Sequence, residues 1–221
     1  MFSVAIDGPA GAGKSTIAKM VAKKMNLVYV DTGSMYRAMA LSCIRQGIEA
    51  NDHERVAQAV KDLNITLEYE DGIQQVILNG ENVNAYIRTE EVGNMTSAIA
   101  TYGEVREKLV AMQQAIAREK DVIMDGRDIG TCVLKDAPVK IYLTAAPRTR
   151  AERRYLELKE KGQECDIDTI EKDIIDRDYR DMHREISPLK QAEDAILVDS
   201  SDMTIQQVVD AISDIIRERI S

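Results

Sequence analysis

Short apolar runs alternate with longer segments of helical periodicity along most of the chain. The short runs are rich in Val, Ile and Leu, which is typical of strands buried on both faces. The longer segments repeat apolar residues every three or four positions, as amphipathic helices do. Strands separated by helices indicate βαβ units and a parallel sheet of about five strands. The predicted strands are residues 3–7, 27–30, 121–125, 139–143 and 195–199, and the predicted helices are residues 14–24, 34–46, 104–119, 148–161, 168–185 and 204–219.

One stretch departs from this rhythm. Residues 65–70 alternate apolar and polar side chains, and residues 75–78 form a second short apolar run. Asp71-Gly72 lies between the runs and Asn79-Gly80 follows the second, and both dipeptides favour the tight turns of β-hairpins. We therefore expect residues from about 62 to about 87 to form a small antiparallel insert on the α/β core.

Composition and charge exclude several classes of protein. The chain has 221 residues, 44% hydrophobic and 30% charged, which suits one domain with a modest insert. No run approaches the ~18 consecutive apolar residues of a membrane span, and residues 1–7 lack the basic start of a signal peptide. A net charge of −9, no Trp and one Phe disfavour nucleic-acid binding. We expect a cytoplasmic monomer with no nucleic-acid or membrane partner.

The cysteines and histidines exclude further kinds of site. Cys43, Cys132 and Cys165 are odd in number and far apart, so they indicate neither a disulfide framework nor a redox pair. Only His53 and His183 are present, which excludes a three-His metal site and disfavours a His-based catalytic triad.

The strongest chemical signal is a glycine-rich segment between the first predicted strand and the first predicted helix. Its sequence, Gly8-Pro9-Ala10-Gly11-Ala12-Gly13-Lys14-Ser15, fits the phosphate-loop pattern G-x-x-x-x-G-K-[ST] and precedes Thr16. Glycines let the backbone wrap a phosphate, while successive N–H groups and the helix N-terminus attract it. Lys14 can reach the β- and γ-phosphates, and the Ser15 hydroxyl can join a Mg²⁺ shell. The alternative is a turn that binds no ligand.

Asp125 suits the second half of such a site. It ends an apolar predicted strand, so its carboxylate is expected at the edge of the sheet where open α/β folds bind ligands. There it can hold Mg²⁺ directly or through water. The alternative is an Asp that only caps the next turn.

Arginines are concentrated in the second half of the chain. Guanidinium groups suit bidentate phosphate recognition and the charge of a transition state. The alternative is a set of solvated helix faces paired with neighbouring acids. The candidates are Arg37, Arg106, Arg127, the cluster Arg148, Arg150, Arg153 and Arg154, and Arg177, Arg180 and Arg184, which share a helical face with Asp181.

A poised general base is not evident, although Asp31 and Asp128 could serve. A hydroxyl acceptor needs such a base, whereas a phosphate acceptor is largely dianionic at neutral pH and does not. The surplus of Arg therefore favours transfer between two phosphates, with catalysis by positioning and electrostatics. A guanine-specific switch would need N-K-x-D, and no Asn precedes a Lys here.

Over essentially its whole length the sequence resembles the bacterial cytidylate kinase (CMP kinase) family of P-loop nucleoside monophosphate kinases. The resemblance rests on four motifs in order and on the hairpin insert. The motifs are IDGPAGAGKST at residues 6–16, DTGSMYR at residues 31–37, DGRDIGT at residues 125–131, and RDYRD at residues 177–181, followed by Arg184 and Ser187-Pro188-Leu189.

The resemblance implies a role for each matching residue. Residues 8–16 would bind ATP, Ser15 and Asp125 would hold Mg²⁺, and Lys14, Asp125, Arg127 and Arg153 would be catalytic. The arginine-rich segment 148–154 would belong to a lid that closes over ATP and excludes water. Arg37, Arg127 and Arg177 would hold the CMP phosphate, Ser97, Arg106 and Asp128 would read cytosine, Asp181 and Arg184 would contact the ribose or complete the acceptor site, Tyr36 would pack on the nucleotide, and Thr32 would bond near it.

The expected architecture is a three-layer P-loop α/β fold with a central parallel sheet, a small β-containing acceptor-binding insert and a helical lid. We expect a core of residues 1–61 and 101–221, an insert of about 62–100 and a lid of about 148–165. The expected reaction is Mg²⁺-dependent phosphorylation of CMP and dCMP by ATP. The alternatives are a P-loop kinase for UMP, dTMP or a hydroxyl-bearing metabolite, and a nucleotide-binding switch.

Overall fold

The computed structural model describes residues 1–70 and 72–220, which form two compact units. Unit 1 joins Met1–Tyr29 to Glu119–Ser221, and unit 2 is Val30–Arg118. The predicted division into core, insert and lid stays a prediction.

The central sheet has five strands in the order β2-β6-β1-β7-β8. β1 pairs in parallel with β6 and with β7, and β7 pairs in parallel with β8. Four of the five residues of β1 are buried, as its apolar sequence requires. The predicted parallel α/β sheet is confirmed. The strands are β1 (Ser3–Asp7), β2 (Val28–Asp31), β6 (Val122–Gly126), β7 (Val139–Thr144) and β8 (Ile196–Asp199).

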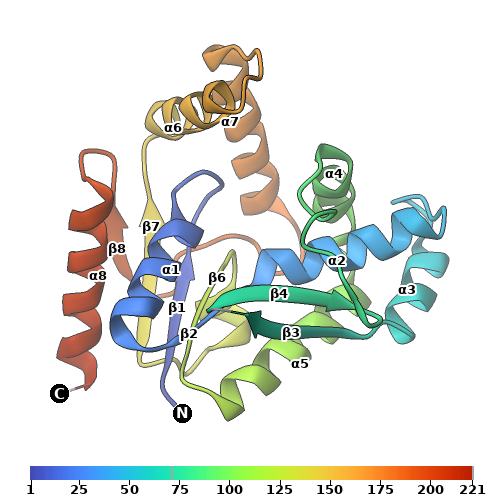
Figure 1. The fold of residues 1–221 in the computed structure, drawn as a ribbon, viewed down its shortest axis with the longest axis horizontal. Coiled ribbons are helices and arrows are strands. Elements are labelled where there is room, and N and C mark those ends of the chain that lie inside the picture. The colour runs from blue at the N-terminus through green and yellow to red at the C-terminus, as the bar shows by residue number, and fades with distance from the viewer. Residues whose placement is uncertain (71, 221) are drawn as a thin grey trace. The chain divides into compact units, whose positions relative to one another are not determined.

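Helices α1 (Lys14–Met25) and α8 (Ile205–Ile220) pack side by side against this sheet (Figure 1). Their apolar stripes meet strand residues in one buried cluster, in which Val21, Ile123 and Ile212 have no exposed surface. Burial of such side chains stabilises the fold by roughly 1.5–3 kcal/mol each. This core holds the β1–α1 connection, and therefore the glycine-rich loop, in place.

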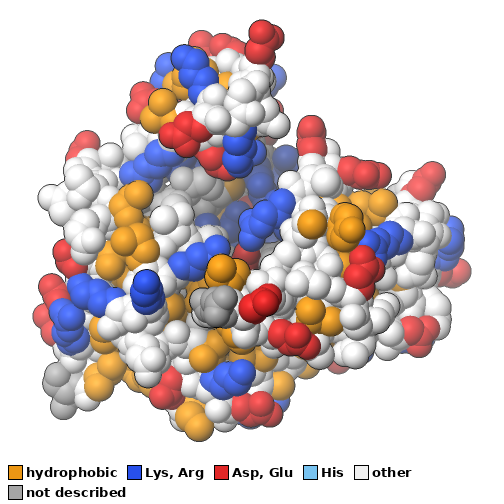
Figure 2. All heavy atoms as spheres, in the orientation of Figure 1, with side chains coloured by type: hydrophobic (Ala, Val, Ile, Leu, Met, Phe, Trp, Pro, Cys, Tyr) orange, Lys and Arg blue, Asp and Glu red, His pale blue; other side chains and the backbone are white. Residues whose placement is uncertain are grey.

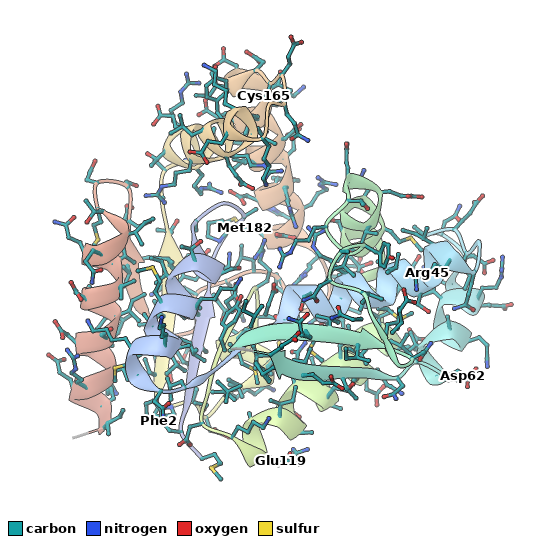
Figure 3. All side chains as sticks on the ribbon, in the orientation of Figure 1. Phe2, Arg45, Asp62, Glu119, Cys165 and Met182 are labelled. Carbon is teal, nitrogen blue, oxygen red and sulfur yellow. The ribbon has the colours of Figure 1, made fainter. Side chains whose placement is uncertain are left out.

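The pair α6 (Pro147–Glu160) and α7 (Ile167–His183) carries many charged side chains on its surface, beside the exposed apolar side chains of Leu156, Ile175, Tyr179 and Met182. Arg148 Nη1 bonds Asp168 Oδ1 at 2.6 Å and Glu171 Oε2 at 2.9 Å. In Figure 2, blue and red side chains are interspersed over these two helices. Cys165 lies near the end of the pair where the helices are joined (Figure 3).

Unit 2 has its own core beneath a three-stranded antiparallel sheet. β3 (Ile65–Glu70) pairs with β4 (Ile73–Leu78) so that Ile65 lies opposite Leu78, and β4 pairs with β5 (Glu81–Asn82). The predicted hairpin is confirmed; Asp71 of its turn lies outside the described residues. The helices are α2 (Thr32–Arg45), α3 (His53–Lys61), α4 (Glu90–Ile99) and α5 (Gly103–Glu119).

Four of the described elements are not among those predicted: α3, α4, the two-residue strand β5 and a π-helical turn at Ile129–Val133. α3 is only nine residues long and buries three of them, and α4 contains Gly93, a poor helix former, so neither gives a long run of helical periodicity in the sequence. Within the described part of the chain, no helix has the length and apolar character needed to cross a bilayer.

Gly8 occupies a position that admits no side chain. Its φ is +148°, and a Cβ there would lie 1.9 Å from the carbonyl oxygen of Leu143 in β7. The loop backbone therefore passes directly over the neighbouring strand. We expect Gly8→Ala to lower the free energy of unfolding by about 3 kcal/mol or more.

Urea denaturation followed by circular dichroism measures this effect. Gly103→Ala is the matched control, because a Cβ at Gly103 meets no atom within 4 Å. A Gly8→Ala variant as stable as the Gly103→Ala variant would contradict the close approach.

Candidate functional site

The glycine-rich loop has the backbone geometry of an anion nest. Gly11 and Gly13 have φ of +75° and +86°, which side-chain-bearing residues rarely adopt. Gly13 is the N-cap of α1, and no described side chain bonds to the free N–H groups there. No acidic residue lies in the first turn of α1 either. The free N–H groups and the helix dipole together favour an anion at this point.

Lys14 is buried at the start of α1, with 6% of its surface exposed. Its Nζ donates to the carbonyl oxygen of Pro9 at 2.7 Å, within its own loop. Burial lowers the pKa of Lys14 well below its usual value, and the positive charge of Arg127 lowers it further, against the opposing effect of Asp125 and Asp7. The ammonium group is thus held where an added negative charge would stabilise it.

Ser15 and Asp125 form the oxygen-rich part of the site. Ser15 Oγ donates to Asp125 Oδ2 at 2.8 Å, and the Tyr29 hydroxyl donates to Asp125 Oδ1 at 2.9 Å. The parallel register places Ile6 of β1 beside Asp125 of β6, so the carboxylate lies next to the loop that follows β1. The side chains predicted to share a metal ion are therefore adjacent.

Asp7 anchors the turn that follows Asp125. Its two carboxylate oxygens accept hydrogen bonds from the backbone N–H groups of Ile129 and Gly130, each at 2.7 Å. Burial raises the pKa of Asp7 to about 6, although these two hydrogen bonds oppose the shift. The turn begins directly after Asp128, so Asp7 helps to hold Asp128 in place.

Helix α7 presents charged residues to the same region of unit 1. Arg127 Nε donates to Asp181 Oδ2 at 2.9 Å, and Arg184 Nη2 lies 3.8 Å from Asp128 Oδ1. Burial acts to raise the pKa of Asp181, but Arg127, Arg177 and Arg184 outweigh it and hold the pKa below its usual value. Arg177 also contributes to the lowered pKa of Lys14. Arg177 thus acts electrostatically on Lys14 of the phosphate loop and on Asp181, Arg184 acts on Asp181, and Arg180 donates to the carbonyl oxygen of Asp176 at the exposed side of the helix.

The four arginines at the start of α6 differ in their surroundings. Arg148 and Arg154 are each 48% exposed and pair with surface acids. Arg153 donates to the carbonyl oxygen of Ser200 at 2.6 Å. Arg150 is buried and bonds to the phosphate loop itself. The catalytic role of Arg153 stays a prediction.

In unit 2 the residues predicted for the acceptor are partly buried and anchored. Arg37 Nη1 donates to the carbonyl oxygen of Ile87 at 3.1 Å, and the Arg106 guanidinium lies 6.0 Å from the Tyr36 ring centre. Ser97 Oγ donates to the carbonyl oxygen of Gly93 at 3.1 Å, which is the backbone contact of an ordinary helix hydroxyl. Thr32 is buried at the start of α2.

Asp31, considered above as a general base, has a structural role in unit 2. One carboxylate oxygen caps α2 by accepting from Ser34 N at 3.0 Å, and the other pairs with Arg88 at 3.0 Å. Both oxygens are therefore occupied.

Two buried acids of this site are not among the residues predicted from the sequence. Asp7 lies at the end of a predicted strand, and Asp178 lies on a predicted helix. The sequence does carry a signal for Asp7, because an acidic residue there ends an otherwise mainly apolar strand. Asp178 carried no signal, because it is one of several acids on α7 and only burial distinguishes it.

Comparison with known proteins identifies relatives over the whole chain. The family model described as cytidylate kinase matches residues 4–218. A cytidylate kinase from Leuconostoc mesenteroides is 50% identical over 100% of this chain and 98% of its own length. Cytidylate kinases from Caldicellulosiruptor saccharolyticus and Clostridium botulinum are 49% and 48% identical, over 94% and 98% of this chain and 92% and 98% of their own lengths.

Solved structures show the same fold at low identity. Shikimate kinase from Bacteroides thetaiotaomicron has a TM-score of 0.50 at 12% identity, covering 99% of this chain and 98% of its own. An uncharacterized protein from Eubacterium ventriosum has a TM-score of 0.51 at 14% identity, covering 100% and 98%. At this identity the likeness concerns the fold alone.

The raised pKa of Asp7 predicts a specific dependence of stability on pH. Because the folded-state pKa of about 6 exceeds the ordinary value of 3.8, the folded state binds the proton more tightly. The stabilisation from protonated Asp7 is complete below about pH 4 and is lost as the pH rises through 6. The total change is on the order of 3 kcal/mol.

We expect Asp7→Asn to remove this dependence. Urea unfolding of both proteins between pH 4 and 7 should show the stability of the wild type falling relative to the variant as the pH rises. Parallel stability curves would show that the folded protein leaves the Asp7 pKa unperturbed.

Proposed function

This chain belongs to the cytidylate kinase family, and from that premise we propose that it transfers the terminal phosphoryl group of ATP to CMP and dCMP. One observation carries the proposal. The buried Lys14 bonds the glycine loop, and the next residue, Ser15, bonds the buried Asp125. Such a site suits the phosphates of a donor nucleotide. We also propose a cytoplasmic location, in keeping with the three free cysteines, and a monomeric state.

The chemistry requires charge compensation rather than a covalent intermediate. The phosphate oxygen of CMP attacks in line, so two polyanions must come together and their repulsion must be neutralised. Lys14 and Arg127 supply positive charge beside the loop, and Arg177 lowers the Lys14 pKa by its proximity. Arg153 on α6 is proposed to add a further charge to the transferred group. Fixed charges in a site shielded from water stabilise the transition state without reorganisation.

The residues present fit a magnesium ion. Ser15 Oγ and Asp125 Oδ2 lie 2.8 Å apart, and two such oxygens together with phosphate oxygens are the ligands that Mg²⁺ prefers. When bound, the ion neutralises charge on the phosphates during transfer. The Tyr29 hydroxyl, which donates to the other oxygen of Asp125, orients the carboxylate for this role.

The acceptor roles follow the family likeness. Holding the CMP phosphate is assigned to Arg37, Arg127 and Arg177. Contacts with the ribose are assigned to Asp181 and Arg184. Reading of cytosine is assigned to Asp128, Ser97 and Arg106, because a carboxylate with a guanidinium matches the ring N3 and the exocyclic amine. Tyr36 is assigned to nucleotide packing and Thr32 to a contact beside it.

A panel of acceptors tests the proposed reaction. ADP release in the presence of ATP and Mg²⁺ would be measured with CMP, dCMP, UMP, dTMP and a set of hydroxyl-bearing metabolites. We expect CMP and dCMP to give the highest kcat/KM. Preference for another acceptor would make the chain a kinase of different specificity, and ATP binding without acceptor-stimulated turnover would make it a switch.

Lys14→Ala tests the charge compensation assigned to the loop. We expect kcat to fall at least about 100-fold, because loss of one charge at the transition state has effects of this size. CMP affinity should change by no more than a few-fold. Steady-state kinetics and calorimetry measure the two quantities, with Lys23→Ala, an exposed lysine of the same helix, as the control. Turnover within a few-fold of the wild type would remove Lys14 from this role.

A further inference from the structure

Arg150 is the buried member of the α6 arginines, and each of its three guanidinium nitrogens has a partner. Its side chain is 4% exposed. Nε donates to the carbonyl oxygen of Ala145 at 2.8 Å, and Nη1 donates to the carbonyl oxygen of Ala10 at 2.8 Å. Nη2 lies 2.6 Å from Asp178 Oδ2. One rigid fork thus joins α6, α7 and the phosphate loop.

Asp178 completes the contact from the side of α7. Its Oδ1 accepts from the backbone N–H of Ala10 at 3.4 Å, while Oδ2 pairs with Arg150. Both polar groups of Ala10 are therefore held by the same ion pair. Gly11 also lies beside Arg150, because a Cβ added at Gly11 would be in van der Waals contact with the Cβ of Arg150, at 3.4 Å.

The consequence concerns the peptide groups that follow Ala10. With its N–H and carbonyl both bonded, Ala10 cannot rotate its flanking peptides freely. The next residues, Gly11 to Ser15, form the bend and the first turn of α1 that make the anion nest. Because Ala10 is held, Gly11 to Ser15 lose less conformational freedom when ATP binds. Such preorganisation raises the affinity for ATP.

We propose that Arg150 and Asp178 are positioning residues for the donor phosphates, acting through Ala10 of the phosphate loop. The inference rests on the proposed use of ATP as donor. It separates Arg150 from the lid arginines, since its guanidinium is committed to the base of the loop.

Single substitutions measure the effect on nucleotide affinity. Arg150→Met and Asp178→Asn should each weaken ATP binding about tenfold, as expected for the loss of a charged hydrogen bond. CMP affinity should stay within about twofold of the wild-type value, because Arg150 and Asp178 bond the phosphate loop, which is proposed to hold ATP. Arg150→Lys, which keeps the charge without the fork, should give an intermediate ATP affinity. Calorimetry with ATP and with CMP measures both, and Asp176→Asn and Arg217→Met are the surface controls.

The double variant Arg150→Met with Asp178→Asn separates positioning from stability. Each single change leaves one buried charge without its partner and should lower the melting temperature, whereas the double change leaves none and should recover part of it. We expect ATP affinity to remain low in the double variant. The proposal would be overturned if the double variant recovered ATP affinity together with its melting temperature. It would also be overturned if the substitutions weakened ATP binding and CMP binding equally.

The wild type provides the check on the underlying function. If it binds ATP but does not phosphorylate CMP, the proposed reaction fails while the affinity comparison still tests the ion pair. If it phosphorylates CMP and the single variants bind ATP normally, only the positioning role fails.

Discussion

The constraint on which the rest of the structure depends is the crowding of positive charge at the start of α1. Lys14 is buried, and Arg127 and Arg177 both act to lower its pKa. Asp7 and Asp125 oppose this effect without cancelling it. Crowded positive charge lowers the stability of the protein without a ligand. A bound polyanion relieves the repulsion, so the arrangement favours ligand binding at the expense of stability. The loop, the Ser15–Asp125 pair and the arginines of α7 all serve that end.

Helix α7 is the element that coordinates these parts within unit 1. Asp178 bonds Ala10 and Arg150, Asp181 bonds Arg127, and Arg184 lies beside Asp128. Asp178 and Asp181 are three residues apart on neighbouring turns of one helix face, and Arg184 is the first residue after the helix. The helix is therefore held both to the phosphate loop and to the segment after β6. Arg177 and Asp181, which are proposed to contact the acceptor, also lie on this helix.

Much of this could be predicted from the sequence because short-range patterns carry it. The bounds of β1 and β3 are those predicted, because the apolar run of β1 stops at Asp7 and Gly8 and the alternation of β3 stops at Asp71-Gly72. The pairing of Ser15 with Asp125 follows from a loop and a strand end at the same sheet edge. The π-helical turn at Ile129–Val133 could not be foreseen, because it depends on bonds to Asp7 more than 120 residues away. The same holds for Arg150, which only tertiary burial distinguishes from Arg148, Arg153 and Arg154.

The most direct test of the central claim is a crystal structure with an analogue that joins adenosine to cytidine through a chain of phosphates. In the free protein the Lys14 ammonium donates to the carbonyl oxygen of Pro9. The account predicts that Lys14 Nζ leaves this carbonyl and bonds a phosphate oxygen held by the glycine loop. A complex in which Lys14 stays on Pro9 and the loop holds no phosphate would contradict it.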